Sequence, residues 1–233
     1  MEQLSARINS LPVSETLAMA AKARELKNQG IDIIGLSLGE PDFNTPEFIK
    51  EAAIQAVQDN WNSYSPVDGY ADLKKAICQK FKRDNGLEYQ PSQVVVSTGA
   101  KQSIANVCMV LLDPGDEVLF PAPYWVSYSA IATLAEAKSI IIPSSIETDF
   151  KITPEQLEAA ITPKTKLVMF NSPNNPSGTI YTEAEYRALG KVLEKYPDIY
   201  ILSDEIYEHI NYGTAHFSIA ALPELYDRTI TVN

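Results

Sequence analysis

Cysteine and histidine are scarce in this chain, which has two of each among its 233 residues. The cysteines form no Cys-x-x-Cys pair, and neither they nor His209 and His216 have the spacing of metal ligands. We therefore predict no metal site. We interpret Cys78 and Cys108 as reduced, buried thiols of a cytoplasmic protein, and the two histidines as local structure.

Positive charge and long apolar runs are also lacking. Lys and Arg number 19 against 30 Asp and Glu, and the net charge of -11 disfavours nucleic acid or an anionic membrane as a partner. The longest apolar run, around residues 104–112, is interrupted by Asn106 and is too short to span a bilayer. The N-terminal segment MEQLSARINS lacks the apolar stretch of a signal peptide, so we expect a cytoplasmic location.

Glycine-rich nucleotide motifs are the third absence. The chain contains no Gly-x-Gly-x-x-Gly and no P-loop pattern, so we set aside a dinucleotide-dependent dehydrogenase. The composition is 45% hydrophobic and 21% charged, which suits a protein with a sizeable core rather than a disordered or repetitive chain.

Strand patterns alternate with helix patterns along most of the chain. Strands are expected at residues 31–38, 93–97, 117–120, 138–142, 166–171, 199–203 and 228–232. Helices are expected at residues 14–29, 46–58, 71–83, 101–112, 124–135, 154–160 and 182–196, and capping boxes start the last two. Unbroken apolar strands such as KLVMF and IYILS predict an α/β fold with a mostly parallel sheet covered by helices on both faces.

Ligands on such a sheet bind beyond the carboxyl ends of its strands. The segments STGAKQ, PAPYW, SPNNPSG and DEIYE follow four of the expected strands. The first enters a helix whose free N–H groups could bind phosphate, or it is an ordinary turn. Trp125 could stack on a planar ring or belong to the core, and Asn174 and Asn175 offer amide donors.

Asp204 closes an apolar strand, where a carboxylate is costly to bury without a partner. A cationic ring nitrogen would supply that partner, and a helix cap is the alternative. Together the four segments match the needs of pyridoxal 5'-phosphate (PLP), which requires an anchored phosphate, a fixed ring and a protonated ring nitrogen.

The chain resembles the class I/II aminotransferases of PLP fold type I over essentially its whole length, and most closely the bacterial aspartate aminotransferases. The motifs that carry the resemblance are SLGEPDF, YSPVDGYADLKKAI, STGAKQ, LDPGDEV, PAPYWVSY, NSPNNPSG, LSDEIYEH and TITVN. Their order and spacing make a chance match not credible.

The resemblance implies a role for each site residue. Asp204 and Tyr207 are the expected catalytic residues: Asp204 pairs with the ring nitrogen, and Tyr207 and Asn175 bind the 3-oxygen. Trp125 is expected to stack on the ring. The expected phosphate ligands are Gly99, Ala100, Lys101 and, toward the partner subunit, Tyr64. The expected substrate-binding residues are Gly39, Trp125, Asn175 and Lys101.

The resemblance also implies a homodimer and a domain plan. Residues 1–12 would form an N-terminal arm, residues 13–44 part of a small domain, and residues 45–233 an incomplete large domain that binds PLP. A lysine at position 101 is associated with acidic substrates in the similar bacterial group. We therefore expect transamination between aspartate and 2-oxoglutarate. An aromatic or prephenate aminotransferase, a β-lyase and a lysine-free binding protein are the alternatives.

In the family pattern a Schiff-base lysine, and then an arginine that binds substrate, follow the motif TVN. By that spacing the lysine would lie about four residues beyond Asn233. We therefore interpret the chain as truncated before that lysine and expect the 233 residues alone not to catalyse transamination.

Overall fold

The computed structural model describes residues 4–11, 15–36, 39, 41–210 and 212–233. The chain divides into two compact units, one of residues 12–67 and one of residues 1–11 with 68–233. The first contains α2 (Glu15–Asn28) and α3 (Glu47–Gln58). The second contains the sheet and is the unit that carries the site.

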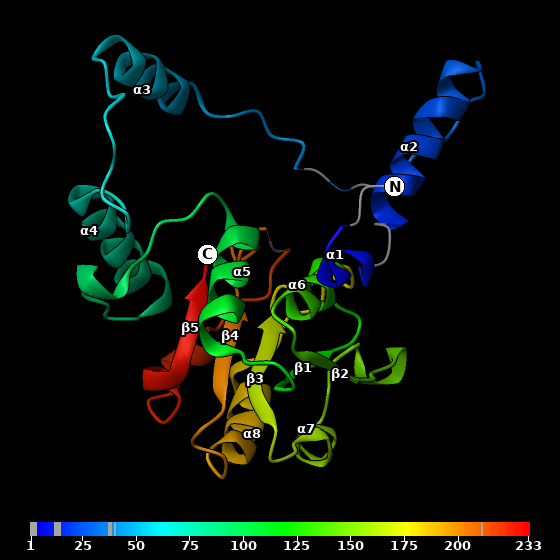
Figure 1. The fold of residues 1–233 in the computed structure, drawn as a ribbon. Coiled ribbons are helices and arrows are strands. Elements are labelled where there is room, and N and C mark those ends of the chain that lie inside the picture. The colour runs from blue at the N-terminus through cyan, green and yellow to red at the C-terminus, as the bar shows by residue number, and fades with distance from the viewer. Residues whose placement is uncertain (1–3, 12–14, 37–38, 40, 211) are drawn as a thin grey trace. The chain divides into compact units, whose positions relative to one another are not determined.

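The sheet is five-stranded and parallel, with the order β2-β1-β3-β4-β5 (Figure 1). The strands are β1 (Glu117–Pro121), β2 (Lys138–Ile142), β3 (Thr165–Asn171), β4 (Tyr200–Asp204) and β5 (Thr229–Val232). The helices of this unit are α1 (Ala6–Asn9), α4 (Ala71–Lys80), α5 (Ala100–Leu111), α6 (Ser127–Leu134), α7 (Pro154–Ala160) and α8 (Glu183–Leu193). A π-helical turn, Phe81–Asn85, continues α4, and short 3-10 turns lie at Pro91–Gln93, Ile146–Thr148, Ile219–Ala221 and Tyr226–Arg228.

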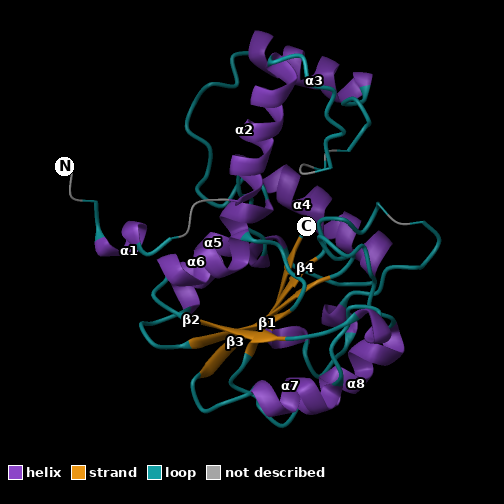
Figure 2. Cartoon of the chain, turned by 90° about the vertical axis from the view of Figure 1, so that its right-hand side faces the viewer, coloured by secondary structure: helices purple, strands orange, loops and turns teal. Residues whose placement is uncertain are grey.

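Alternate residues of the strands feed two separate cores. In β3, Leu167 and Met169 pack with α5 and α6, whereas Val168 and Phe170 pack with α7 and α8. Successive side chains of a strand point to opposite faces, so a strand buried on both faces is apolar throughout. Figure 2 shows the sheet between these two helix layers. The predicted α/β fold is therefore confirmed.

Two predicted strands are not found. Residues 31–36 have no regular structure, and Ser37 and Leu38 lie outside the described residues. Residues 94–97 join no ladder, and Val96 N–H donates instead to the backbone oxygen of Asp68 at 3.1 Å. The apolar pattern of both segments is typical of strands. A strand also needs a neighbouring strand to pair with, and no described strand pairs with either segment.

The predicted helix starts are mostly confirmed. Thr153 with Gln156 and Thr182 with Glu185 form the two capping boxes that their spacing predicts. The helix predicted from residue 124 begins later, at Ser127, after the Pro-x-Pro turn. No helix among the described residues is long and apolar enough to cross a membrane.

Candidate active site

The site begins at the carboxyl ends of β3 and β4, which a side-chain hydrogen bond joins. Asn171 and Asp204 are register partners, and the Asn171 side-chain amide donates to the backbone oxygen of Asp204 at 2.9 Å. Asn171 Oδ1 accepts from the backbone N–H of Asn175 at 2.7 Å. Asn171 therefore fixes the two loops that follow these strands.

Asp204 is a buried carboxylate, only 3% exposed, at the end of β4. Its Oδ2 accepts a hydrogen bond from the Tyr128 hydroxyl at 2.5 Å, and its Oδ1 accepts from the backbone N–H of Ile206 at 3.3 Å. No ion pair within the described ranges includes Asp204. Burial raises the pKa of Asp204, against the opposing effect of its two hydrogen bonds. The site thus holds a buried carboxyl group that has no cationic partner among the described residues.

Asn175 contacts Tyr207, which lies in the loop that follows Asp204. The Asn175 side-chain amide donates to the Tyr207 hydroxyl at 3.3 Å, and both residues are half-buried. They come from the loops after β3 and β4, so the parallel sheet brings together two residues 32 positions apart. An amide and a phenol at one point can both hydrogen-bond a ligand oxygen.

The amino end of α5 forms a second part of the site. Gly99 precedes the helix with a φ of +84°, a conformation that favours glycine, and it provides no side-chain cap. The first-turn N–H groups of Ala100 and Lys101 have no acceptor within an α-helix. Such N–H groups, with the positive end of the helix dipole, can bind a phosphate.

Trp125 lies between Lys101 and Tyr128. The Lys101 ammonium lies 4.8 Å from the centroid of the Trp125 ring, and the Trp125 and Tyr128 rings meet edge to face at 5.5 Å. Trp125 is half-buried and Lys101 is exposed. The structure therefore brings the helix-start lysine to the same side of the sheet as the aromatic residue and Asp204.

Gly39 and Tyr64 belong to the 12–67 unit and are both exposed. The neighbours of Gly39 in the SLGEP motif, Leu38 and Glu40, lie outside the described residues. The roles expected for these two residues stay predictions.

The family model for "aminotransferase class I and II" matches residues 31–233. The chain belongs to the class I and II aminotransferase family. It is 51% identical to an aspartate/prephenate aminotransferase of Nitrosomonas europaea and 49% identical to an aspartate aminotransferase of Bacillus subtilis, each alignment covering 99% of this chain and 59% of the relative. The chain thus spans about three fifths of the length of these aminotransferases.

Solved aminotransferase structures have the same fold. The aspartate aminotransferase of Rhizobium meliloti superposes with a TM-score of 0.95 at 47% identity, over 98% of this chain and 58% of that one. The enzyme of Thermus thermophilus, solved with maleate, gives a TM-score of 0.93 at 41% identity, over 99% of this chain and 60% of that one.

Aminotransferases of this family depend on PLP, and the residues present fit that cofactor. The donor set offers the first-turn N–H groups of α5 for a phosphate, and an amide with a phenol for a ring oxygen. It also offers a buried carboxylate without a described cation, the partner that a protonated ring nitrogen needs.

Sequence reasoning missed three residues of this aminotransferase site. Tyr128 and Asn171 bind Asp204 directly, and Glu205 lies wholly buried next to it. Tyr128 follows Trp125 by three residues, a helical spacing that could have placed both on one face. Asn171 is the polar end of an apolar strand, as Asp204 is, and the same argument could have found it.

Proposed function

We propose that this chain is the cofactor-binding part of a PLP-dependent aminotransferase that transfers the amino group between aspartate and 2-oxoglutarate. The observation that carries this is the buried Asp204 carboxylate at the end of β4, which has hydrogen-bond donors but no described cation. A protonated ring nitrogen placed there would stabilise that charge and be stabilised by it.

The other residues would hold the rest of the cofactor. Asn175 and Tyr207 would bind the ring's 3-oxygen, and Trp125 would stack on the ring. Gly99, Ala100 and Lys101 would hold the phosphate at the start of α5. Bound PLP supplies an electron sink for bonds broken at the α-carbon of an amino acid. The protein's part is to keep the ring nitrogen protonated and the ring in a fixed orientation.

Lys101 is our proposed determinant of acidic substrates. Its ammonium lies at the Trp125 ring, where a substrate's side-chain carboxylate could meet it. The names of the relatives support aspartate, and those that also act on prephenate make prephenate the second candidate. In the whole enzyme, Lys101→Ala should reduce the preference for aspartate over alanine. An unchanged preference would remove Lys101 from the proposal.

We propose a cytoplasmic homodimer in which residues 1–12 are an arm, residues 13–44 belong to a small domain, and Tyr64 reaches the phosphate of the partner subunit. The exposed side chain of Tyr64 supports this. The two free cysteines also support it, although only Cys108 is buried as predicted and Cys78 is half-buried. Light scattering on the purified protein tests the dimer, and a monomeric mass at assay concentration would contradict it.

Cofactor binding can be tested with pyridoxamine 5'-phosphate (PMP), which shares the ring and phosphate of PLP but does not require a lysine. Isothermal titration should show PMP binding by the chain, and Asp204→Asn should weaken it at least tenfold, since a buried ion pair is lost. Equal affinity of the two proteins would overturn the assignment of Asp204.

A further inference from the structure

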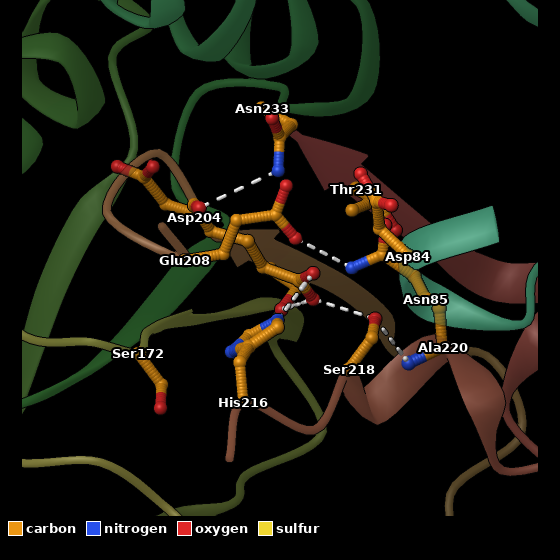
Figure 3. A network of polar contacts seen from close by, with 12 residues as sticks. Asp84, Asn85, Ser172, Asp204, Glu208, His216, Ser218, Ala220, Thr231 and Asn233 are labelled. Atoms are coloured by element: carbon orange, nitrogen blue, oxygen red, sulfur yellow. Dashed lines mark hydrogen bonds and ion pairs between the residues drawn. The ribbon is translucent and has the colours of Figure 1, made fainter. Parts of the chain in front are cut away.

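Glu205 directly follows Asp204, and the residue is 0% exposed. Its Oε1 accepts hydrogen bonds from the hydroxyls of Ser203 at 2.7 Å and Ser218 at 2.6 Å. His216 Nε2 lies 2.9 Å from Oε2. Figure 3 labels His216 and Ser218, the two side chains that residues 216–218 contribute to these contacts. Because a carboxylate oxygen accepts, Nε2 carries the hydrogen in this contact. Glu205 therefore joins the site loop to residues 216–218, which no cofactor role involves.

The backbone of Glu205 is fixed as well. Its N–H donates to the Val232 oxygen at 2.8 Å, and its carbonyl accepts from the backbone N–H of Glu208 at 2.9 Å. The Asn233 side-chain amide also donates to that carbonyl, at 3.4 Å. Glu205 is thus held at both backbone groups and at both carboxylate oxygens, with Asp204 on one side and Tyr207 two residues further on.

A wholly buried carboxylate is costly unless its hydrogen bonds are made. Any displacement of this loop would break hydrogen bonds of Glu205, whose carboxylate is buried. The same loop carries the two residues proposed for the ring nitrogen and the 3-oxygen. The hydrogen bonds of Glu205 therefore restrict the positions that Asp204 and Tyr207 can take.

We propose that Glu205, held by His216 and Ser218, is a positioning residue that fixes Asp204 and Tyr207 for the cofactor ring. This inference rests on the proposed PLP-binding function. It assigns His216 a definite role through one ring nitrogen, Nε2. The other nitrogen, Nδ1, is buried and has no hydrogen-bond partner within the described part of the chain.

The two ring nitrogens of His216 allow a matched pair of variants. In His216→Gln the side-chain amide can take the place of Nε2 and still donate to Glu205. In His216→Asn the amide lies nearer the backbone, at the level of Nδ1, and cannot reach. The PMP affinity of each full chain is measured by isothermal titration, with inorganic phosphate as a second ligand that tests the α5 phosphate site alone.

We expect His216→Asn to weaken PMP binding on the order of tenfold, as for a lost hydrogen bond to a charged group. Phosphate affinity should stay unchanged, and His216→Gln should keep most of the PMP affinity. If Glu205 had only a structural role, His216→Asn would lower the affinity for both PMP and phosphate, or for neither. Equal PMP affinity of the Asn and Gln variants would overturn the proposal.

Two further proteins keep the result interpretable. If circular dichroism shows that His216→Asn is unfolded, Ser218→Ala takes its place. Ser218→Ala should lower the affinity for PMP severalfold and leave the affinity for phosphate unchanged. Asp204→Asn separates the two claims. Its failure to weaken PMP would overturn the proposed function. If Asp204→Asn weakens PMP but neither His216→Asn nor Ser218→Ala does, only the role of Glu205 is overturned.

Discussion

Removing the Tyr128 hydroxyl tests how Asp204 is held. Tyr128→Phe keeps the ring that packs with Phe120, Tyr124 and Trp125, but it deletes the 2.5 Å hydrogen bond to Asp204 Oδ2. A hydrogen bond to a charged group contributes about 1.5–3 kcal/mol. Both partners are buried, so we expect the free energy of unfolding at neutral pH to fall by about 2 kcal/mol.

The size of this effect should depend on pH. Burial raises the pKa of Asp204, and the Tyr128 bond opposes that rise, so the variant's Asp204 has a still higher pKa. A carboxyl with a raised pKa makes stability fall as pH rises from its unfolded value through its folded pKa. The difference between wild type and variant should therefore be small when Asp204 is protonated and reach its full size above the variant's pKa. Burial also raises the pKa of Tyr128, so it remains a donor throughout.

Urea denaturation followed by circular dichroism, at several pH values from acid to slightly alkaline, measures both quantities. Tyr124→Phe is the matched control, because Tyr124 stacks on Phe120 and Tyr128 and makes no described hydrogen bond to Asp204. A pH-independent difference for Tyr128→Phe, or one no larger than for Tyr124→Phe, would refute the reasoning.

Three further substitutions test other parts of the structure. The Arg228 guanidinium donates to the backbone oxygens of Leu193, Tyr196 and Ile199, so Arg228→Lys should lower the free energy of unfolding by about 2 kcal/mol in urea denaturation; an unchanged midpoint would contradict this. Gly99→Ala should cost about 2 kcal/mol of stability, because the φ of +84° disfavours a side chain, and a smaller cost would argue against that backbone conformation. Burial opposes the ionisation of Glu208, but hydrogen bonds from Lys80 and Asn85 outweigh it and lower the pKa of Glu208. Lys80→Met should therefore lower the free energy of unfolding by about 2 kcal/mol at pH values above the unfolded pKa of Glu208, and by less as the pH falls. An equal loss at acid and neutral pH would be the contrary result.

Much of the sheet could be predicted because its strands are short, apolar and bounded by polar segments. The strand at residues 138–142 and the helix at residues 154–160 were predicted with the bounds that the structure has. The segment 93–97 has the same apolar pattern but is not a strand, since pairing depends on a neighbour that local sequence does not specify. The apolar periodicity therefore predicted where helices and strands lie better than it predicted which extended segments join the sheet.

The site could be predicted in part for a similar reason. Asp204, Asn175 and Tyr207 stand just after strands, where parallel topology collects functional residues. The partners that hold them come from elsewhere in the chain. Tyr128 is 76 residues from Asp204, and His216 is 11 residues from Glu205. Such contacts depend on packing in three dimensions, so a histidine without a motif was interpreted as local structure.

The most direct test of the account is the protonation state of the cofactor ring nitrogen when it is bound. PMP labelled with 15N in the ring would be added to the chain, at a pH where the ring nitrogen of free PMP is neutral, and its 15N resonance recorded. Because the Asp204 carboxylate would pair with the ring nitrogen, we predict the chemical shift of the protonated ring in the wild type and of the neutral ring in Asp204→Asn. A neutral ring nitrogen in the bound wild type, or the same shift in both proteins, would contradict the account.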